Sequence, residues 1–244
     1  MNLRDNTILI TGVTSGIGLA LLTKFYQLGN KIIAVARDSE RLNALTEKFP
    51  SIVPLQAELA DHNSVENLIS EIHKNHQDLN ILVNNAGVQY NYEFGGADDN
   101  YKKIENEIRV NFTSPLQLCY RLIPILEKHK EAAIVSVSSG LGLVPKKSAP
   151  VYCGTKGGLH LFTKALRYQL EGGNIKVFEI IPPLVDTKMT EGRGSGKITA
   201  EQLTDEFIKN FERNKFEINI GKVKFLRMIQ RVSPQIADHI LKNG

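Results

Sequence analysis

Tyr152 and Lys156 are the residues of this chain whose types and spacing most directly offer chemistry. Positions four apart lie on one face of a helix, so this spacing would place the Lys156 ammonium beside the Tyr152 phenol. A free phenol has a pKa of about 10, and an adjacent cation lowers that pKa by stabilising the anion. Such a tyrosine would exchange protons at neutral pH. The same spacing also occurs where a tyrosine and a lysine merely pack side by side with solvated tips.

A glycine-rich turn follows the first apolar run of the chain. Residues 7–10 favour a short strand, and apolar residues recur at helical spacing from Leu19 onward. Between them lies Gly12-x-x-x-Gly16-x-Gly18, in which glycines let the backbone approach a pyrophosphate and the new helix offers free N–H groups. The pattern therefore indicates a dinucleotide site, although a plain tight turn would use the same residues.

The second predicted strand, residues 31–36, ends at Arg37. In a dinucleotide-binding fold an acidic residue near this position binds the adenosine ribose, whereas an arginine accommodates a 2′-phosphate. We therefore predict that NADPH is preferred over NADH. Two alternatives stay open, since Arg37 could pair with Asp38 or Glu40 on the surface and Asp38 could itself meet a ribose.

Strands and helices alternate along most of the chain. The sequence predicts further strands at 52–57, 81–83, 133–137 and 176–181, a possible last strand at 217–220, and helices at 39–49, 63–75, 101–129 and 151–170. Repeated strand-helix order predicts an α/β fold with a doubly wound parallel sheet, that is, a three-layer Rossmann-type architecture. With 244 residues, we expect residues 1–244 to form one domain.

Polar residues interrupt two of these elements. Asn84-Asn85-Ala86-Gly87 closes the fourth strand, where asparagines can bridge strand ends and brace a cofactor wall or simply form a turn. The helix over residues 101–129 contains Pro115 and Pro124. A proline cannot donate to the carbonyl four residues earlier, so Pro115 would free the carbonyl of Asn111 to hold a relay water. An ordinary kinked helix with Asn111 as a polar filler is the alternative.

Three loops and the C-terminal segment are the regions expected to form the substrate side. We predict that loops 88–99, 140–151 and 184–199 build the pocket, with residues 90–100 lying over the site and residues 189–197 acting as a mobile lid. Tyr90, Tyr92, Phe94, Leu141, Leu143 and Met189 suggest an apolar wall, with solvent or the core as the alternative surroundings of each side chain. The basic, amphipathic tail, residues 222–244, is expected to pack on its own domain or a subunit interface, with membrane or partner docking as the alternative.

Composition narrows the functional classes. The net charge of +4 is mild and no dense basic run is present, so we expect no nucleic-acid partner. No apolar run is long enough to span a membrane, the chain begins without an apolar leader, and there are only two cysteines, Cys119 and Cys153. We therefore expect a cytoplasmic protein with no disulfide and no stable membrane insertion. His73 and His76 have no further ligand at metal-binding spacing, so no metal site is predicted.

Taken together, these motifs resemble the short-chain dehydrogenase/reductase family. The glycine turn, Asn84 to Gly87, Asn111, Ser139 and Tyr152-x-x-x-Lys156 occur in the family's order, with Ser139 thirteen residues before the tyrosine. The resemblance covers roughly residues 5–190 and includes the family's NADP-preferring branch. Residues 182–187, Pro-Pro-Leu-Val-Asp-Thr, together with the basic tail are also similar to a bacterial oxidoreductase subgroup associated with D-alanylation operons.

The resemblance implies a catalytic tetrad. Tyr152 would be the acid/base, Lys156 would lower the tyrosine pKa and hold the nicotinamide ribose, Ser139 would bond the reacting oxygen, and Asn111 would position a water. The resemblance also implies cofactor contacts from Gly12, Thr14, Ser15, Gly16, Ile17, Gly18, Arg37, Glu58, Leu59, Asn85, Ala86, Gly87, Tyr152, Lys156, Pro182, Val185 and Thr187.

Three departures from the family pattern stand out. The family's usual Asn-Pro-Gly after the sixth strand is Ile181-Pro182-Pro183 here, and its usual aspartate after the third strand is Glu58. The chain also lacks the family's common glycine-rich ending. These differences bear on the nicotinamide and adenine contacts rather than on the tetrad.

The sequence thus predicts an NADP(H)-dependent oxidoreductase that transfers a hydride between nicotinamide and a carbonyl or alcohol substrate. The alternative is an NADPH-sensing module that regulates a partner. By analogy with the family we expect a homodimer or homotetramer, with the helices at 101–129 and 151–170 forming the interface.

Overall fold

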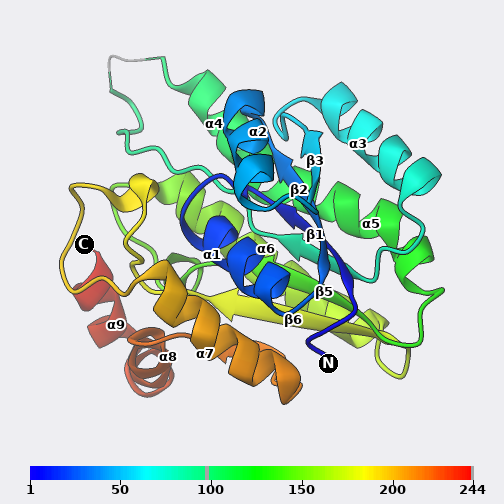
Figure 1. Ribbon diagram of the computed structural model, residues 1–244. Coiled ribbons are helices and arrows are strands. Elements are labelled where there is room, and N and C mark those ends of the chain that lie inside the picture. The colour runs from blue at the N-terminus through cyan, green and yellow to red at the C-terminus, as the bar shows by residue number, and fades with distance from the viewer. Residues whose placement is uncertain (97–98, 243–244) are drawn as a thin grey trace.

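The computed structural model of the protein describes residues 1–96 and 99–242. Within these residues, parallel strands form one sheet in the order β3-β2-β1-β4-β5-β6-β7 (Figure 1). The strands are β1 (Thr7–Thr11), β2 (Lys31–Ala36), β3 (Val53–Gln56), β4 (Ile81–Asn84), β5 (Ala132–Val137), β6 (Ile175–Ile181) and β7 (Glu217–Asn219). The predicted doubly wound parallel sheet is confirmed, including the last strand. Because the chain winds outward from β1 to β3 and then returns to β4, the strand order reverses between β1 and β4.

Helices cover both faces of the sheet and make the fold three-layered. One face packs against α1 (Gly16–Gln27), α2 (Ser39–Lys48) and α7 (Ala200–Glu212). The other face packs against α3 (His62–Asn75), α5 (Ser114–Leu126) and α6 (Pro150–Gln169). In Figure 1, α1 and α7 lie in front of the sheet and α5 and α6 behind it.

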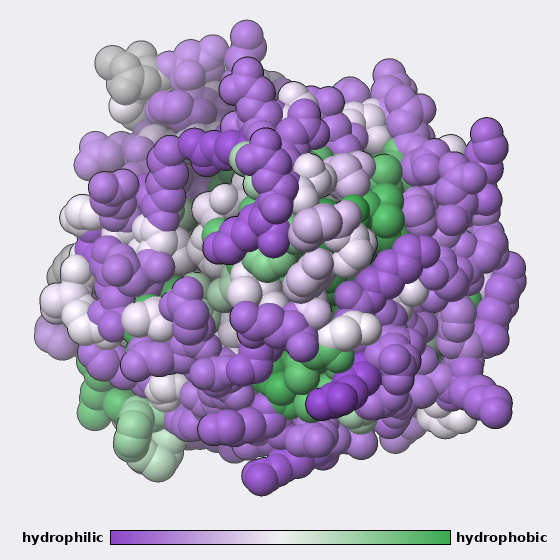
Figure 2. Space-filling model, viewed as in Figure 1, coloured by the Kyte–Doolittle hydropathy of each residue, from purple (hydrophilic) through white to green (hydrophobic). Residues whose placement is uncertain are grey.

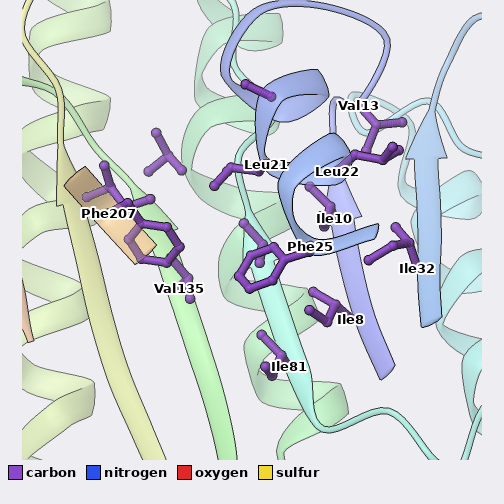
Figure 3. Packing of buried hydrophobic residues seen from close by; sticks show 14 of the residues in the cluster. Ile8, Ile10, Val13, Leu21, Leu22, Phe25, Ile32, Ile81, Val135 and Phe207 are labelled. Atoms are coloured by element: carbon purple, nitrogen blue, oxygen red, sulfur yellow. The ribbon is translucent and has the colours of Figure 1, made fainter. Parts of the chain in front are cut away.

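Alternating side chains of the strands feed the two cores. On β1, Ile8 and Ile10 join the α1 side whereas Leu9 joins the α3 side, as the two-residue period of a strand requires. Figure 3 shows Phe25 of α1 beside Ile8 and Ile10. Phe25 also meets Phe207 of α7 edge to face at 6.3 Å between ring centres. Strands buried on both faces explain why the sequence shows continuous apolar runs.

The helix predicted over residues 101–129 is divided into three parts. α4 (Tyr101–Ile108) leads into a π-helical turn, Arg109–Thr113, which leads into α5. Pro115 cannot donate to the carbonyl of Asn111, and the wider π turn accommodates this missing bond. The helix ends at Leu126, three residues before the predicted boundary.

The C-terminal tail forms two helices that pack on the chain itself. α8 (Val223–Val232) and α9 (Pro234–Leu241) are separated at Ser233, just before a proline. Gln230 donates to the carbonyl of Leu143 at 2.7 Å, and the N–H of Lys147 donates to the carbonyl of Lys242. Apolar side chains of α8 also remain exposed, and Figure 2 shows hydrophobic surface at its lower left edge, where Figure 1 draws α8. Residues 243–244 of the predicted tail lie outside the described residues.

No helix within residues 1–96 and 99–242 combines the length and the apolar character needed to cross a bilayer.

Candidate active site

A cavity of about 1000 Å³ lies at the carboxyl ends of the strands. Its walls include the segments that follow β1, β4, β5 and β6. Open α/β sheets bind ligands at this edge, where the strand order reverses and the connections diverge to opposite faces. The cavity therefore occupies the position that the topology makes available.

The glycine turn forms one wall of the cavity. Gly12 has φ of +73°, a left-handed conformation that disfavours a side chain. A Cβ on Gly18 would overlap the carbonyl oxygen of Gly12 and lie 2.5 Å from the amide nitrogen of Asn85. That amide donates to the carbonyls of Thr11 and Gly12 at 2.8 and 3.2 Å. Asn85 therefore braces the turn from the neighbouring strand, which is the bridging role predicted for this asparagine pair.

Asn84 points to the other side of the sheet. Its amide nitrogen lies 3.3 Å from the sulfur of Cys119, and its side-chain oxygen is buried without a hydrogen-bond partner among the described residues. Cys119 and Cys153 are both buried and free.

Two arginines line the end of the cavity that is formed by the segments after β2 and β3. Arg37 and Arg41 are exposed and four residues apart. Asp38 caps α2 by accepting from the Arg41 N–H at 3.0 Å, and it also pairs with the Arg41 side chain at 3.3 Å. Within residues 1–96 and 99–242, Arg37 forms no ion pair, so the alternative pairing with Asp38 or Glu40 is not observed. The sequence reasoning missed Arg41, although its spacing from Arg37 was a usable signal.

The turn after β3 supplies Glu58 and Leu59 to the same end. Glu58 stabilises this turn locally, because its side chain accepts from the Ala60 N–H at 3.1 Å and its own N–H donates to Ser64. Its carboxylate is thus partly committed to the backbone.

Tyr152 and Lys156 both lie on the buried face of α6 and line the middle of the cavity. The Lys156 ammonium donates to the carbonyl of Val137 at 2.8 Å and lies 5.9 Å from the centre of the Tyr152 ring. Lys156 is only 4% exposed. The i, i+4 spacing therefore brings the two groups together at the end of β5.

Burial shifts the pKa of Tyr152 and the pKa of Lys156 in the directions that favour the neutral form of each side chain. Burial raises the pKa of Tyr152 to about 12, although a hydrogen bond with Ser139 acts in the opposite direction. Burial lowers the pKa of Lys156 to about 8, and the negative charge of Glu179 opposes that decrease. In this geometry the Lys156 ammonium donates to the Val137 carbonyl, and the charge of Lys156 is not among the causes that shift the Tyr152 pKa. The predicted lowering of the Tyr152 pKa by Lys156 therefore stays a prediction. At neutral pH the phenol is in its proton-donating form.

Ser139 and Asn111 complete the predicted tetrad in different ways. Ser139 lines the cavity, and its hydroxyl accepts from the Leu141 N–H at 3.1 Å. Asn111 is fully buried behind the cavity wall. Its amide accepts from and donates to the backbone of Val88, both at 2.8 Å, and reaches Thr155 at 3.3 Å. Asn111 therefore fixes the segment after β4 against α6.

The remaining predicted cofactor residues also border this cavity. They are Thr14, Ser15, Gly16, Ile17, Ala86, Gly87, Pro182, Val185 and Thr187. The Pro182 carbonyl accepts from the Gly140 N–H at 3.0 Å, which ties the end of β6 to the loop after Ser139. The structure thus brings all the predicted cofactor residues to one cavity, together with three members of the tetrad.

Comparison with known proteins agrees with this geometry. The family model described as short chain dehydrogenase matches residues 6–198. The chain belongs to the short-chain dehydrogenase family. Among its relatives, the uncharacterized oxidoreductase DltE of Bacillus subtilis is 37% identical over 233 residues, which cover 93% of this chain and 92% of that protein. This relative agrees with the predicted resemblance to oxidoreductases of D-alanylation operons.

Two further similarities extend the family assignment. Serine 3-dehydrogenase of Agrobacterium fabrum is 32% identical over 193 residues, covering 79% of this chain and 77% of that protein. A short chain dehydrogenase from Burkholderia cenocepacia, solved with NADP, has a TM-score of 0.88 at 22% identity and covers 100% of both chains. At that identity the structural match shows the shared fold. The protein is thus an oxidoreductase of the short-chain dehydrogenase type.

The apolar wall predicted for this short-chain dehydrogenase was partly wrong. Leu141 and Met189 line the cavity, but Tyr90, Tyr92, Phe94 and Leu143 do not. Buried Glu107 explains the difference, because it accepts from the Tyr90 N–H at 3.0 Å and from the Tyr92 hydroxyl at 3.2 Å. These bonds hold the loop against α4 rather than over the site. Residues 97–98 of the predicted loop lie outside the described residues.

Helices α8 and α9 provide lining that the sequence reasoning missed. Apolar side chains of the two helices line the cavity, namely Val223, Phe225, Leu226, Ile229, Ile240 and Leu241. The amphipathic pattern of the tail was recognised, but nothing in that pattern indicated which surface it would meet. Val185 and Ile198, on either side of the segment 189–197 that was predicted to be a lid, form a β-bridge.

A buried polar cluster behind Lys156 was also missed. Glu179 of β6 is fully buried and contacts His160 of α6 at 2.9 and 3.0 Å. The hydroxyl of Ser138 donates to the same carboxylate. This cluster links β5, β6 and α6 directly beneath the site. The negative charge of Glu179 favours the ammonium form of Lys156.

Proposed function

We propose that this short-chain dehydrogenase uses NADP(H) to reduce a carbonyl group or oxidise the corresponding alcohol, with Tyr152 as the acid/base. The observation that carries the proposal is the convergence of Ser139, Tyr152 and Lys156 on the cavity bordered by the glycine turn. The lining residues fit a dinucleotide because the turn exposes backbone N–H groups at the start of α1 and the far end carries two arginines. A bound nicotinamide would supply the hydride chemistry.

The protein side chains would supply orientation and a proton. In the reducing direction, the Tyr152 phenol would donate its proton to the substrate oxygen, because its raised pKa keeps it protonated. Ser139 would hydrogen-bond the same oxygen, and Lys156 would stabilise the phenolate that remains. Asn111 would position the segment after β4 through its two hydrogen bonds with the backbone of Val88. We also propose that Asn111 positions a water that relays protons.

The preference for NADPH rests on this chain's own residues. Solved short-chain dehydrogenases include complexes with NADP and with NAD, so the family alone does not decide the cofactor. Arg37 and Arg41 would form a pair of forked cations for a 2′-phosphate. Asp38 is already engaged with α2 and Arg41, which makes it less available to a ribose hydroxyl.

We also propose that the protein is a homodimer or homotetramer assembled through α4, α5 and α6. Large apolar or aromatic side chains are exposed on these helices, including Tyr101, Tyr120, Leu161 and Tyr168. Exposed groups of this kind favour an interface between copies. The alternative of an NADPH-sensing module has no specific observation in its favour, whereas Ser139, Tyr152 and Lys156 together line the cavity.

A substrate panel tests the proposed function. The wild-type protein would be incubated with NADPH and aldehydes, ketones or oxo acids, and with NADP⁺ and the matching alcohols, while absorbance of the reduced nicotinamide is followed. The panel should include 3-hydroxy acids, because the Agrobacterium relative is named for serine. We expect turnover of at least one class with NADPH favoured over NADH. Confirmed NADPH binding without turnover of any class would contradict the proposal.

A further inference from the structure

A carboxylate is buried on the face of the sheet that α6 covers. Glu179 of β6 is fully buried. Its neighbours Phe178 and Ile180 belong to the core on the α1 side, so the alternation of a strand turns Glu179 toward the α6 side. A buried carboxylate makes folding less favourable unless donors satisfy it. The donors that Glu179 binds therefore indicate what the group does in this fold.

The two donors come from the two elements that carry the catalytic groups. The hydroxyl of Ser138, at the end of β5, donates to Oε1 of Glu179. Nδ1 of His160, on α6, lies 3.0 Å from Oε1 and 2.9 Å from Oε2. An ionised carboxylate only accepts, so Nδ1 carries the proton in this contact. The carboxylate thus bridges the end of β5 and the helix α6.

On the β5 side, the bridge ends between two residues of the site. Val137 directly precedes Ser138, and its carbonyl accepts from the Lys156 ammonium at 2.8 Å. Ser139 directly follows Ser138 and lines the cavity. A displacement of Ser138 would therefore move the acceptor of Lys156 and the hydroxyl of Ser139 together. The N–H groups of Ser138 and Gly140 bond the end of β6 at 2.9 and 3.0 Å, but these bonds do not reach α6.

On the α6 side, the bridge ends on the same helix face as the catalytic pair. His160 follows Lys156 by four residues and Tyr152 by eight, which is the spacing of one face of a helix. All three side chains are buried. The negative charge of Glu179 also opposes the decrease in the Lys156 pKa, in agreement with a carboxylate that binds on both sides of this lysine.

We propose that Glu179 is a positioning residue, which holds the end of β5 and the helix α6 at the separation that lets Ser139 and Tyr152 bind the same substrate oxygen. This inference rests on the proposed function. Glu179 is not among the described residues that line the cavity, so it would contact neither substrate nor cofactor. A displacement of about 1 Å can lower a rate about 10²-fold, and the loss should fall on kcat because binding depends on other groups.

A kinetic double-mutant cycle tests this inference from both ends of the bridge. Ser138→Ala removes the donor on β5, and His160→Leu removes the donor on α6. Each change should lower kcat about tenfold while KM and NADPH affinity stay within about twofold of wild type. The double variant should also lose about tenfold, because either change alone breaks the bridge. A loss of about 100-fold in the double variant would mean independent effects and would overturn the inference.

Two further variants separate positioning from general destabilisation. His160→Asn keeps an N–H donor near the position of Nδ1 and should recover most of the kcat that His160→Leu loses. Thr163→Val removes a buried hydrogen bond of the same helix, from the Thr163 hydroxyl to the Leu159 carbonyl at 2.7 Å, without contact to β5. It should lower stability but leave kcat within about twofold. No recovery in His160→Asn, or an equal loss of kcat in Thr163→Val, would overturn the inference.

Hydrogen exchange of backbone amides, followed by NMR, tests the bridge without turnover. In His160→Leu, the amides of Ser138 and Gly140 should exchange at least about tenfold faster than in the wild type. The amide of Leu9 in β1 serves as the internal reference and should exchange at the wild-type rate. Unchanged exchange at Ser138 and Gly140 would overturn the inference. Absence of any wild-type turnover would remove the proposed function, whereas faster exchange would still support Glu179 as the residue that positions this segment.

Discussion

The two ends of the cavity hold cations in opposite surroundings. At the end formed by the segments after β2 and β3, Arg37 and Arg41 are exposed, and the Arg41 side chain keeps 51% of its surface open to solvent. At the end beside Tyr152, Lys156 is 4% exposed and its ammonium has a backbone carbonyl as its hydrogen-bond acceptor. An exposed arginine has little effect on the free energy of folding, whereas a buried ammonium with one neutral acceptor makes folding less favourable.

In the proposed function, the two ends of the cavity would contribute to ligand binding and proton transfer in different ways. The arginines can attract and orient a phosphate without a change in their own charge, because guanidinium groups stay protonated. Lys156 has a pKa of about 8, so its charge responds to small changes around it. Proton transfer to a substrate needs a protonated donor, such as Tyr152, and a nearby group whose charge can change near neutral pH, such as Lys156. In the proposed function, the exposed end would therefore select the ligand, and the buried end would act on it.

Replacement of Lys156 should have the largest effect on activity. Lys156→Met keeps the length of the side chain and removes the charge that would stabilise a Tyr152 phenolate. We expect turnover to fall by about 10²–10³, the range for losing one electrostatic stabiliser in an active site. The measurement is kcat with a substrate from the panel. Lys164→Met, an exposed lysine on the same helix, is the matched control and should leave kcat within about twofold.

The same variant should show an opposite effect on stability that depends on pH. The folded-state pKa of Lys156, about 8, lies below the ordinary value of 10.5, so the unfolded chain binds more protons between these values. Wild-type stability therefore gains a contribution as pH rises from 8 to 10.5, and the unfavourable effect of the buried ammonium is complete below pH 8. Lys156→Met lacks this contribution. Its stability advantage should be on the order of 3 kcal/mol at pH 7 and should shrink toward pH 10.

Denaturant unfolding of the two proteins at pH 7, 8, 9 and 10 measures this difference. Subtracting one curve from the other removes the contribution of other titrating groups. A constant difference across the pH range would show that the Lys156 pKa is not lowered.

Loss of Arg37 should weaken one cofactor selectively. Arg37→Ala removes a charge-assisted contact with the 2′-phosphate, which is worth about 1.5–3 kcal/mol when formed, with exposure favouring the lower value. We expect NADPH affinity to fall about tenfold and NADH affinity to change less than twofold. Fluorescence titration of the protein with each cofactor provides the measurement. Equal losses for the two cofactors would place Arg37 away from the phosphate.

Asp38 should have the smallest effect. Asp38→Asn keeps a side-chain oxygen to cap α2 and removes the carboxylate that competes for Arg41. An exposed pair of this kind is worth about 0.2–1 kcal/mol, so NADPH affinity should rise by up to about fivefold. If Asp38 instead bound a ribose hydroxyl, the same titration would show weaker binding of NADH.

Much of the fold and site could be predicted because strand-end motifs are fixed by short-range chemistry. Gly12 and Asn85 directly follow the ends of the parallel strands β1 and β4, and Gly18 lies in the first turn of α1. The positive φ of Gly12 and the bond from the Asn85 side chain to the Thr11 carbonyl fix this turn locally. The spacing of Tyr152 and Lys156 likewise follows from the geometry of one helix. Such constraints can be read from a few neighbouring residues.

The substrate side could not be predicted in the same way because it depends on contacts between distant segments. Tyr90 and Tyr92 turn toward Glu107, and no local pattern indicated that this carboxylate would be buried. α8 meets the loop after β5 through the bond from Gln230 to Leu143, which are 87 positions apart. Polar bonds and apolar packing of this kind are decided by the folded arrangement as a whole.

The most direct test of the central claim is single-turnover kinetics of Tyr152→Phe with NADPH and the best substrate of the panel. The variant removes only the phenolic oxygen, so the cavity and the cofactor contacts should persist. We expect the variant to bind NADPH with an affinity within about twofold of the wild type. We expect its rate of nicotinamide oxidation to be about 10²–10⁴ times lower than that of the wild type. An unchanged oxidation rate with tight NADPH binding would contradict the role of Tyr152 as the proton donor.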